Sequence, residues 1–214
     1  MSLPRWLGAG RAILTGLALG FSAFGGAAST KNDGASLSGD YGDLIVGRDP
    51  STQRVSGYYS SSTDRGQFSC IFYFSGTLRK GRARIDSYFP GALPSDHISG
   101  IATLTRGGAA IIALEKEHGG CWNVQHFADK SYLAKFQLTA PYRWRSIRVV
   151  RAARAYFYDA PGMPKHRAAY VVRGDGVGVL ASPNQSNREW IKVDFVGEPN
   201  SQSGWLRKSD LYPD

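Results

Sequence analysis

The chain has 214 residues and a basic balance, with 26 Lys and Arg against 17 Asp and Glu and a formal net charge of +9. Its 42% hydrophobic content and 26 glycines are typical of a loop-rich globular protein and exclude a wholly disordered chain. The cations are scattered singly, which argues against nucleic-acid binding and predicts only a diffuse attraction to anionic surfaces. The length is enough for one large domain or two small ones.

Residues 1–29 are expected to be a secretory signal peptide. Arg5 and Arg11 precede an apolar stretch, and small residues follow at 25–29. This order is typical of a cleaved signal, and about thirteen apolar residues are fewer than the ~20 that span a bilayer. A retained amphipathic anchor is the alternative. We therefore expect a periplasmic or secreted protein, with no transmembrane span in the mature chain and a flexible leader over residues 30–40.

Residues 41–143 are expected to form an antiparallel β-barrel or sandwich. Short runs of β-forming residues alternate with turn residues, and Phe68, Cys70, Phe72 and Phe74 share one face of their run. A glycine turn at 106–108 predicts one hairpin, and a second is expected from residues 111–112 through 117–120 to Cys121. The expected strand runs are 44–46, 55–59, 68–74, 83–88, 98–104, 109–114, 121–124 and 132–138, with one helical turn at 126–130. So many short strands favour a nearly closed sheet.

The two cysteines, Cys70 and Cys121, are expected to form a disulfide. An even count in an exported protein favours pairing. The bridge would close a loop of about 50 residues, which the chain-entropy treatment values at roughly 4 kcal/mol. The alternative is a pair of free thiols, one of them catalytic.

The C-terminal residues 147–214 show a second set of β-type runs, at 147–150, 155–161, 169–175, 190–195 and 204–206. Their order, with Gly174-Asp175 ending one strand, Trp190 in the next and Gly204-Trp205-Leu206 closing, resembles the bacterial Src-homology-3-like (SH3-like) domains of exported proteins. The resemblance covers under a third of the chain and implies a small all-β barrel. It departs at residues 181–188, a polar loop, and we place the domain boundary near Arg143.

The resemblance implies a module that docks peptidoglycan peptides or other proteins, and it does not assign the binding residues. Aromatic faces beside a carboxylate form a shallow groove for an extended peptide. Within residues 190–195, Ile191, Val193 and Phe195 are expected to face the core. The alternative is that Trp190 or Trp205 is itself a core residue. The candidates for the groove are Tyr156, Tyr158, Asp159, Tyr170, Trp190 and Trp205.

The sequence contains no recognised catalytic, metal or cofactor motif. A metal site would need Glu115, His118, Cys121 and His126, whose spacing is not that of a known zinc site. No Gly-x-Ser-x-Gly motif is present. We therefore expect no metal and no cofactor. The rival interpretation is a cell-wall hydrolase whose site is assembled from Glu115, Glu117, His118 and His126.

The sequence favours a non-enzymatic binding protein of the bacterial envelope, whose partner is a peptidoglycan peptide or an envelope protein and not a nucleic acid. The sharper alternative is an inhibitor or immunity protein against a cell-wall hydrolase or secreted toxin. Such a protein would insert a cationic loop into an acidic cleft. The candidate loops are residues 116–120 and the run containing Arg79, Lys80 and Arg82.

Overall fold

The computed structural model describes residues 37–92, 94–180, 188–197 and 201–213, which belong to one compact unit. The expected signal peptide, residues 30–36 of the expected leader and residues 181–187 of the polar loop lie outside the described residues. The all-β prediction is confirmed, because the helices of the described part are single 3-10 turns: η1 (Asp64–Gly66), η2 (Pro94–Asp96), η3 (Cys121–Asn123) and η4 (Lys208–Asp210). In these same ranges, no helix has the length and hydropathy to cross a membrane.

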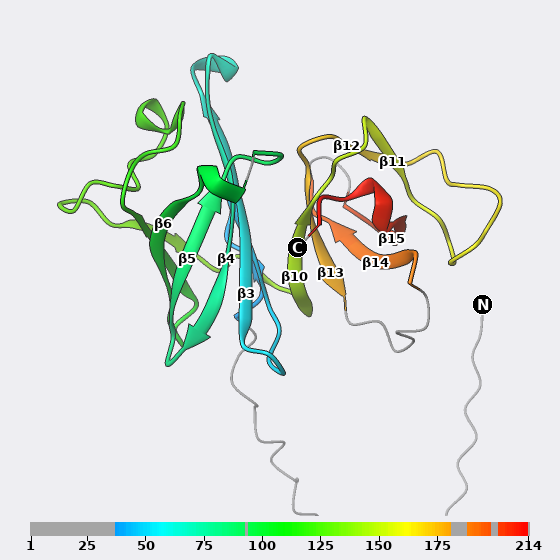
Figure 1. Cartoon of the computed structure of the whole chain (residues 1–214), viewed down its shortest axis with the longest axis horizontal. Helices are drawn as coiled ribbons and strands as arrows, with labels where there is room; N and C mark the ends of the chain where they lie inside the picture. Colours follow the sequence, from blue (N-terminus) through cyan, green and yellow to red (C-terminus); the bar gives the residue numbers. More distant parts are fainter. Residues whose placement is uncertain (1–36, 93, 181–187, 198–200, 214) are drawn as a thin grey trace, which may run out of the picture. The chain divides into compact units, whose positions relative to one another are not determined.

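The first part of the chain, which we call the barrel region (residues 37–141), is one antiparallel sheet of nine strands in the order β8-β7-β6-β5-β4-β3-β2-β1-β9. Figure 1 shows β3 to β6 of this sheet side by side. Neighbouring strands in the sequence pair with one another, so the sheet grows as a meander. Its strands are β1 (Gly39–Asp40), β2 (Leu44–Arg48), β3 (Arg54–Thr63), β4 (Phe68–Arg79), β5 (Arg82–Tyr88), β6 (Ile98–Leu104), β7 (Ala109–Leu114), β8 (Ala134–Gln137) and β9 (Ala140–Pro141).

A single segment closes this sheet on itself. β8 pairs with β7, and β9, two residues later, pairs with β1. Between them, the Leu138 amide donates to the Gly108 carbonyl and the Thr139 amide to the Asp40 carbonyl, both at 2.8 Å. The flexible leader expected over residues 30–40 is therefore wrong for its last residues, because β1 is needed to complete the ring of hydrogen bonds.

The inside of the barrel is filled by large side chains. The alternation expected for β4 and β5 is confirmed from Cys70 onward: Cys70, Phe72 and Phe74 are buried, and so are Ala83, Ile85 and Ser87. Phe72 lies at the centre, with its ring 5.4 Å from that of Tyr59 and 4.9 Å from that of Phe127. Phe68, which was assigned to the same face, is exposed, because it lies at the tip of the β3–β4 hairpin.

The Cys70–Cys121 disulfide is present, and it fastens the loop of residues 115–133 to β4. The expected second hairpin is wrong. Cys121 begins η3 instead of a strand, and β7 pairs with β8. Gly120, at φ 84°, turns the chain into this short helix, and the link to Cys70 holds it there. The helical turn expected at 126–130 is also wrong, and β8 begins at Ala134 instead of Tyr132.

The C-terminal region (residues 144–213) contains two smaller antiparallel sheets. Its core is made mainly of small and branched side chains, with Val193 fully buried and Ile191 and Phe195 packed against it, as expected. The four-stranded sheet has the order β10-β13-β14-β15, and the two-stranded sheet pairs β11 with β12. The strands are β10 (Trp144–Val149), β11 (Arg154–Tyr156), β12 (Tyr170–Val172), β13 (Gly176–Leu180), β14 (Trp190–Phe195) and β15 (Gln202–Arg207).

The two regions share a third cluster of buried residues, made by Tyr58 and Tyr73 of the barrel with Trp144, Ile147 and Val149 of β10. Here β10 packs against the outer faces of β2 and β3, and Tyr73 of β4 joins the cluster at its side. The buried Ile147 amide donates to the Ser56 hydroxyl at 2.7 Å. A Cβ on Gly47 would lie 2.6–2.9 Å from backbone atoms of Ser146, so this close approach requires glycine.

Candidate functional site

An unbroken row of ring contacts runs along the C-terminal region, and we call it the aromatic strip: Tyr170, Tyr156, His166, Tyr158 and Trp190. The ring centroids of successive members are 5.5, 4.1, 6.0 and 4.7 Å apart. Three of these separations lie within the range of roughly 4.5–7 Å of favourable aromatic pairs, and the Tyr156–His166 pair is closer. The register of β11 and β12 explains the first pair, because Tyr156 lies directly opposite Tyr170. Four of the six groove residues predicted from the sequence are therefore brought together.

A guanidinium group lies over each end of the aromatic strip. The Arg154 guanidinium carbon is 4.9 Å from the centroid of the Tyr170 ring. At the other end, the Arg207 guanidinium carbon is 5.6 Å from the centroid of the Tyr158 ring and 5.7 Å from that of the Trp190 ring. Hydrogen bonding to Tyr156 is the main cause that raises the pKa of Arg154. Both positions are cation–π arrangements, and both arginines are exposed.

The remaining two predicted groove residues lie beside the strip. Trp205 pairs through its backbone with Tyr158, and the β14–β15 register places it on the face that carries Trp190 and Arg207. Asp159 forms an ion pair with Arg167, whose Nε and Nη2 lie 2.7 and 2.6 Å from the same carboxylate oxygen. The carboxylate predicted to face a ligand is thus already neutralised by a neighbour.

The strip has an accessible part and a buried part. Tyr170 is 42% exposed and His166 is also exposed, whereas Tyr158 and Trp190 are only 7% and 9% exposed. Trp190 packs edge-on against Tyr158, which gives it a structural role as the base of the strip. A ligand would therefore contact Tyr170, Tyr156 and His166 most directly.

The basic candidates Arg79, Lys80 and Arg82 lie far from the strip in the fold, at the two-residue turn between β4 and β5. Lys80 and Gly81 have φ values of 49° and 81°. This is a tight hairpin turn and not a long insertion loop. The other candidate loop, residues 116–120, belongs to the disulfide-anchored loop.

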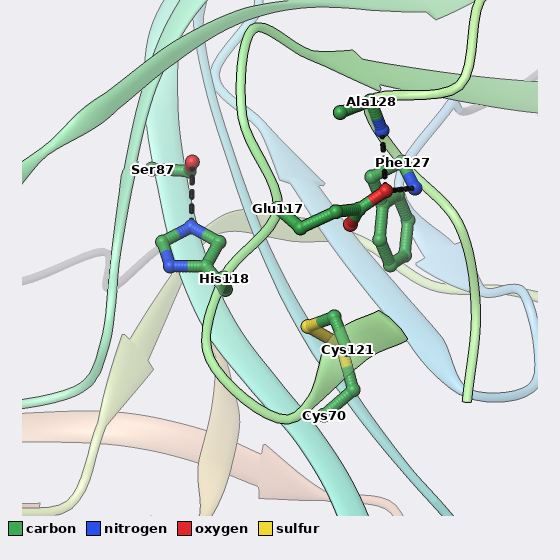
Figure 2. Close-up of a disulfide and its surroundings, with 7 residues drawn as sticks. All are labelled: Cys70, Ser87, Glu117, His118, Cys121, Phe127 and Ala128. Carbon is green, nitrogen blue, oxygen red and sulfur yellow. Dashed lines mark hydrogen bonds between the residues drawn. A yellow bond between two sulfur atoms is a disulfide. The ribbon is translucent and has the colours of Figure 1, made fainter. Parts of the chain in front are cut away.

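Two residues of the rival hydrolase site, Glu117 and His118, have separate structural roles. Figure 2 shows Glu117 and His118 pointing in opposite directions from the loop. One Glu117 oxygen accepts the amides of Phe127 and Ala128, both at 2.8 Å, so this side chain holds the loop. Its other oxygen and His126 Nδ1 are buried without a hydrogen bond. Across the described ranges, no group of three or more His, Cys, Asp or Glu side chains could hold a metal ion.

Ser87 and His118 form a hydrogen bond of 2.9 Å that resembles half of a catalytic triad (Figure 2). The Ser87 hydroxyl already donates its single proton to the Ile98 carbonyl at 2.8 Å, so it accepts from His118 Nε2. Burial lowers the pKa of His118, against the opposing charge of Glu117. Since Ser87 is fully buried and the imidazole acts as a donor, this pair is structural.

Sequence reasoning missed His166, Arg154 and Arg207 as members of this site. Arg207 could have been found, because it faces Trp190 across β14 and β15. His166 gave no signal, since it lies in an irregular segment between β11 and β12 and reaches Tyr156 only through the fold. Comparisons with protein-family models, with curated proteins and with solved structures found no match.

Proposed function

We propose that this chain is an exported, non-enzymatic binding protein of a bacterial cell envelope, whose SH3-like C-terminal region binds an extended peptide of peptidoglycan or of an envelope protein. The observation that carries the proposal is the aromatic strip with an arginine over each end. Rigid aromatic side chains supply contact area at a low cost in conformational entropy. The proposal also fits the disulfide, which forms in oxidising compartments.

The charges of the site favour a peptide that carries carboxylates. Arg154 and Arg207 are exposed, while the one acidic candidate, Asp159, is paired with Arg167. The strip therefore has a cation at each end, of which Arg207 also interacts electrostatically with Asp210. A peptide lying along Tyr170, Tyr156 and His166 would place its backbone on aromatic faces and its acidic groups beside the arginines.

The experiment is co-sedimentation of the purified protein with peptidoglycan sacculi, followed by titration with soluble peptides released from them. Tyr156→Ala and Tyr170→Ala should each weaken binding at least fivefold. Tyr132→Ala is the matched control, because Tyr132 is 53% exposed in the barrel region. Wild-type protein that binds neither sacculi nor released peptides would count against a peptidoglycan ligand, and equal losses for all three variants would contradict the site.

The same preparation tests the inhibitor interpretation. A cell-wall hydrolase retained on the immobilised protein, with salt-sensitive capture that the Tyr156→Ala change leaves intact, would favour an inhibitor. Retention of an envelope protein that Tyr170→Ala abolishes would instead identify a protein as the source of the peptide.

A further inference from the structure

A second candidate site lies in the barrel region, at the opposite end of β4 from Cys70. A hollow of about 820 Å³ opens there beside the β4–β5 turn. Its lining includes the partly buried Leu37 together with Leu78 and Leu104, which belong to the barrel core and are only 4% and 3% exposed. Four cationic residues, Arg48, Lys80, Arg82 and Arg106, line it as well. We call these seven residues the basic mouth.

The charge of the basic mouth is not balanced by neighbouring acids. Among the described residues that line it there is no Asp or Glu. Arg48 donates from Nη2 to the Gln53 side chain at 2.9 Å, but its Nε is buried without a hydrogen-bond partner. A buried donor without an acceptor is costly and rare, but this atom is shielded from solvent and cannot itself contact a ligand in the hollow. The four cations that line the hollow, without an acid among the described lining residues, are what favours an anionic ligand.

The turn that carries two of these cations goes against local preferences. Lys80 has φ 49°, in the left-handed region where Gly, Asn and Asp are favoured. Arg79 and Arg82 lie directly opposite each other across the β4–β5 ladder, where like charges repel. Conflicts between local preference and fold are concentrated at functional sites. Of this pair, Arg82 lines the basic mouth and Arg79 does not.

We propose that the basic mouth binds the anionic headgroup of an amphiphile, a carboxylate or phosphate attached to an apolar chain. The headgroup would pair with the lysine and the arginines, whose planar forks suit both anions. The chain would lie against the apolar part of the lining, where Leu37 is the most accessible of the three leucines. This site is in a different region from the aromatic strip and does not rest on the function proposed above.

The test is calorimetric titration of the purified protein with dodecyl phosphate and dodecanoate below their micelle concentrations. Inorganic phosphate and the uncharged dodecyl maltoside are the probes for headgroup and chain alone. We expect dodecyl phosphate and dodecanoate to bind at least tenfold more tightly than inorganic phosphate or dodecyl maltoside. The anionic headgroup could belong to a free amphiphile or to a membrane lipid. Co-sedimentation with phosphatidylglycerol vesicles and with phosphatidylcholine vesicles distinguishes these two sources. Monomer binding identifies a free amphiphile, and binding confined to anionic vesicles identifies a lipid headgroup.

The decisive variant is Lys80→Asn combined with Arg82→Thr. It should lower affinity for the anionic amphiphile at least tenfold while the thermal midpoint stays the same or rises, because Asn suits the turn and the Arg79–Arg82 repulsion is removed. The control is Lys116→Asn with Lys135→Thr, which removes the same charge from two exposed positions outside the mouth.

Three results would overturn the proposal. One is an equal loss of affinity in the control variant, which would show diffuse electrostatic attraction. Another is binding of inorganic phosphate or dodecyl maltoside as tight as that of dodecyl phosphate. The third is the absence of binding to both the amphiphiles and the vesicles.

Discussion

The barrel region and the C-terminal region use aromatic residues in opposite ways. The barrel places Tyr59, Phe72, Phe74 and Phe127 in its interior, where their rings contact one another. The core cluster of the C-terminal region is made mainly of Val, Ala and Leu, with Phe157 as its fully buried ring, and the accessible rings of the aromatic strip, Tyr170, Tyr156 and His166, lie on the outside.

Geometry explains the difference. A sheet that closes on itself encloses a volume that only large side chains can fill, while two small sheets meet closely enough for branched aliphatic residues. Aromatic residues that are not needed for volume are available for recognition. Exposed rings outside the barrel are therefore better binding candidates than the more numerous rings within it.

The largest expected effect is confined to the barrel region. Replacing Cys70 and Cys121 together with alanine should lower the free energy of unfolding by roughly 4 kcal/mol, because the bridge spans 51 residues and restricts the unfolded chain. Urea denaturation measures this loss. Wild-type protein under reducing conditions should match the variant, and a loss below about 1 kcal/mol would show that the loop is held by packing alone.

The link between the two regions is tested by Ser56→Ala. The change leaves the buried Ile147 amide without its acceptor, and we expect a loss of about 1–3 kcal/mol in urea denaturation. Ser62→Ala, on the exposed end of the same strand, should have little effect. Equal small effects from both changes would mean that the regions are held together by the apolar cluster without help from this hydrogen bond.

The pH dependence of stability should include a contribution from the barrel loop. Burial lowers the pKa of His118 below its ordinary value of 6.5, so the unfolded chain binds this proton more readily. The stability from neutral His118 is complete above pH ~6.5 and is lost as the pH falls. Between pH 7.5 and 5.5, wild-type protein should lose more stability than His118→Gln in chemical denaturation. A variant with the same loss as wild type would assign the pH dependence elsewhere.

The smallest effect is expected beside the aromatic strip. Asp159→Asn removes an exposed ion pair with Arg167 and should change stability by less than about 1 kcal/mol. Since Asp159 is already paired, sacculus binding should stay within twofold of wild type. A tenfold fall in co-sedimentation would show instead that Asp159 contacts the ligand directly.

Much of the barrel was predictable because its local signals agree. The alternation in β4 and β5 and the glycine turn between β6 and β7 led to the observed strands, and the cysteine count led to the disulfide. The second hairpin was wrong because the bond to Cys70, distant in sequence, held Cys121 in a short helix. A local pattern could not reveal that constraint.

For the candidate site, the sequence supplied the aromatic residues but not their arrangement. Tyr156, Tyr158, Tyr170 and Trp190 were predicted by residue type, and the fold added His166, Arg154 and Arg207. The carboxylate predicted to bind a ligand, Asp159, is instead paired with Arg167. The irregular segment between them brings this arginine, eight residues away, within hydrogen-bond distance. Such an ion pair depends on the path of an irregular loop in space. The hydrophobic periodicity of the sequence does not predict that path.

The amino-acid sequence alone determined the all-β class, the disulfide pairing and the residue types available for binding. Strand alternation depends only on neighbouring residues, and two cysteines in one chain allow a single pairing. Only the tertiary structure decided how residues 134–141 close the barrel, where four cations meet at its mouth, and which rings stay accessible. Those properties depend on contacts between distant segments, and such contacts are fixed by the packing of the whole sheet.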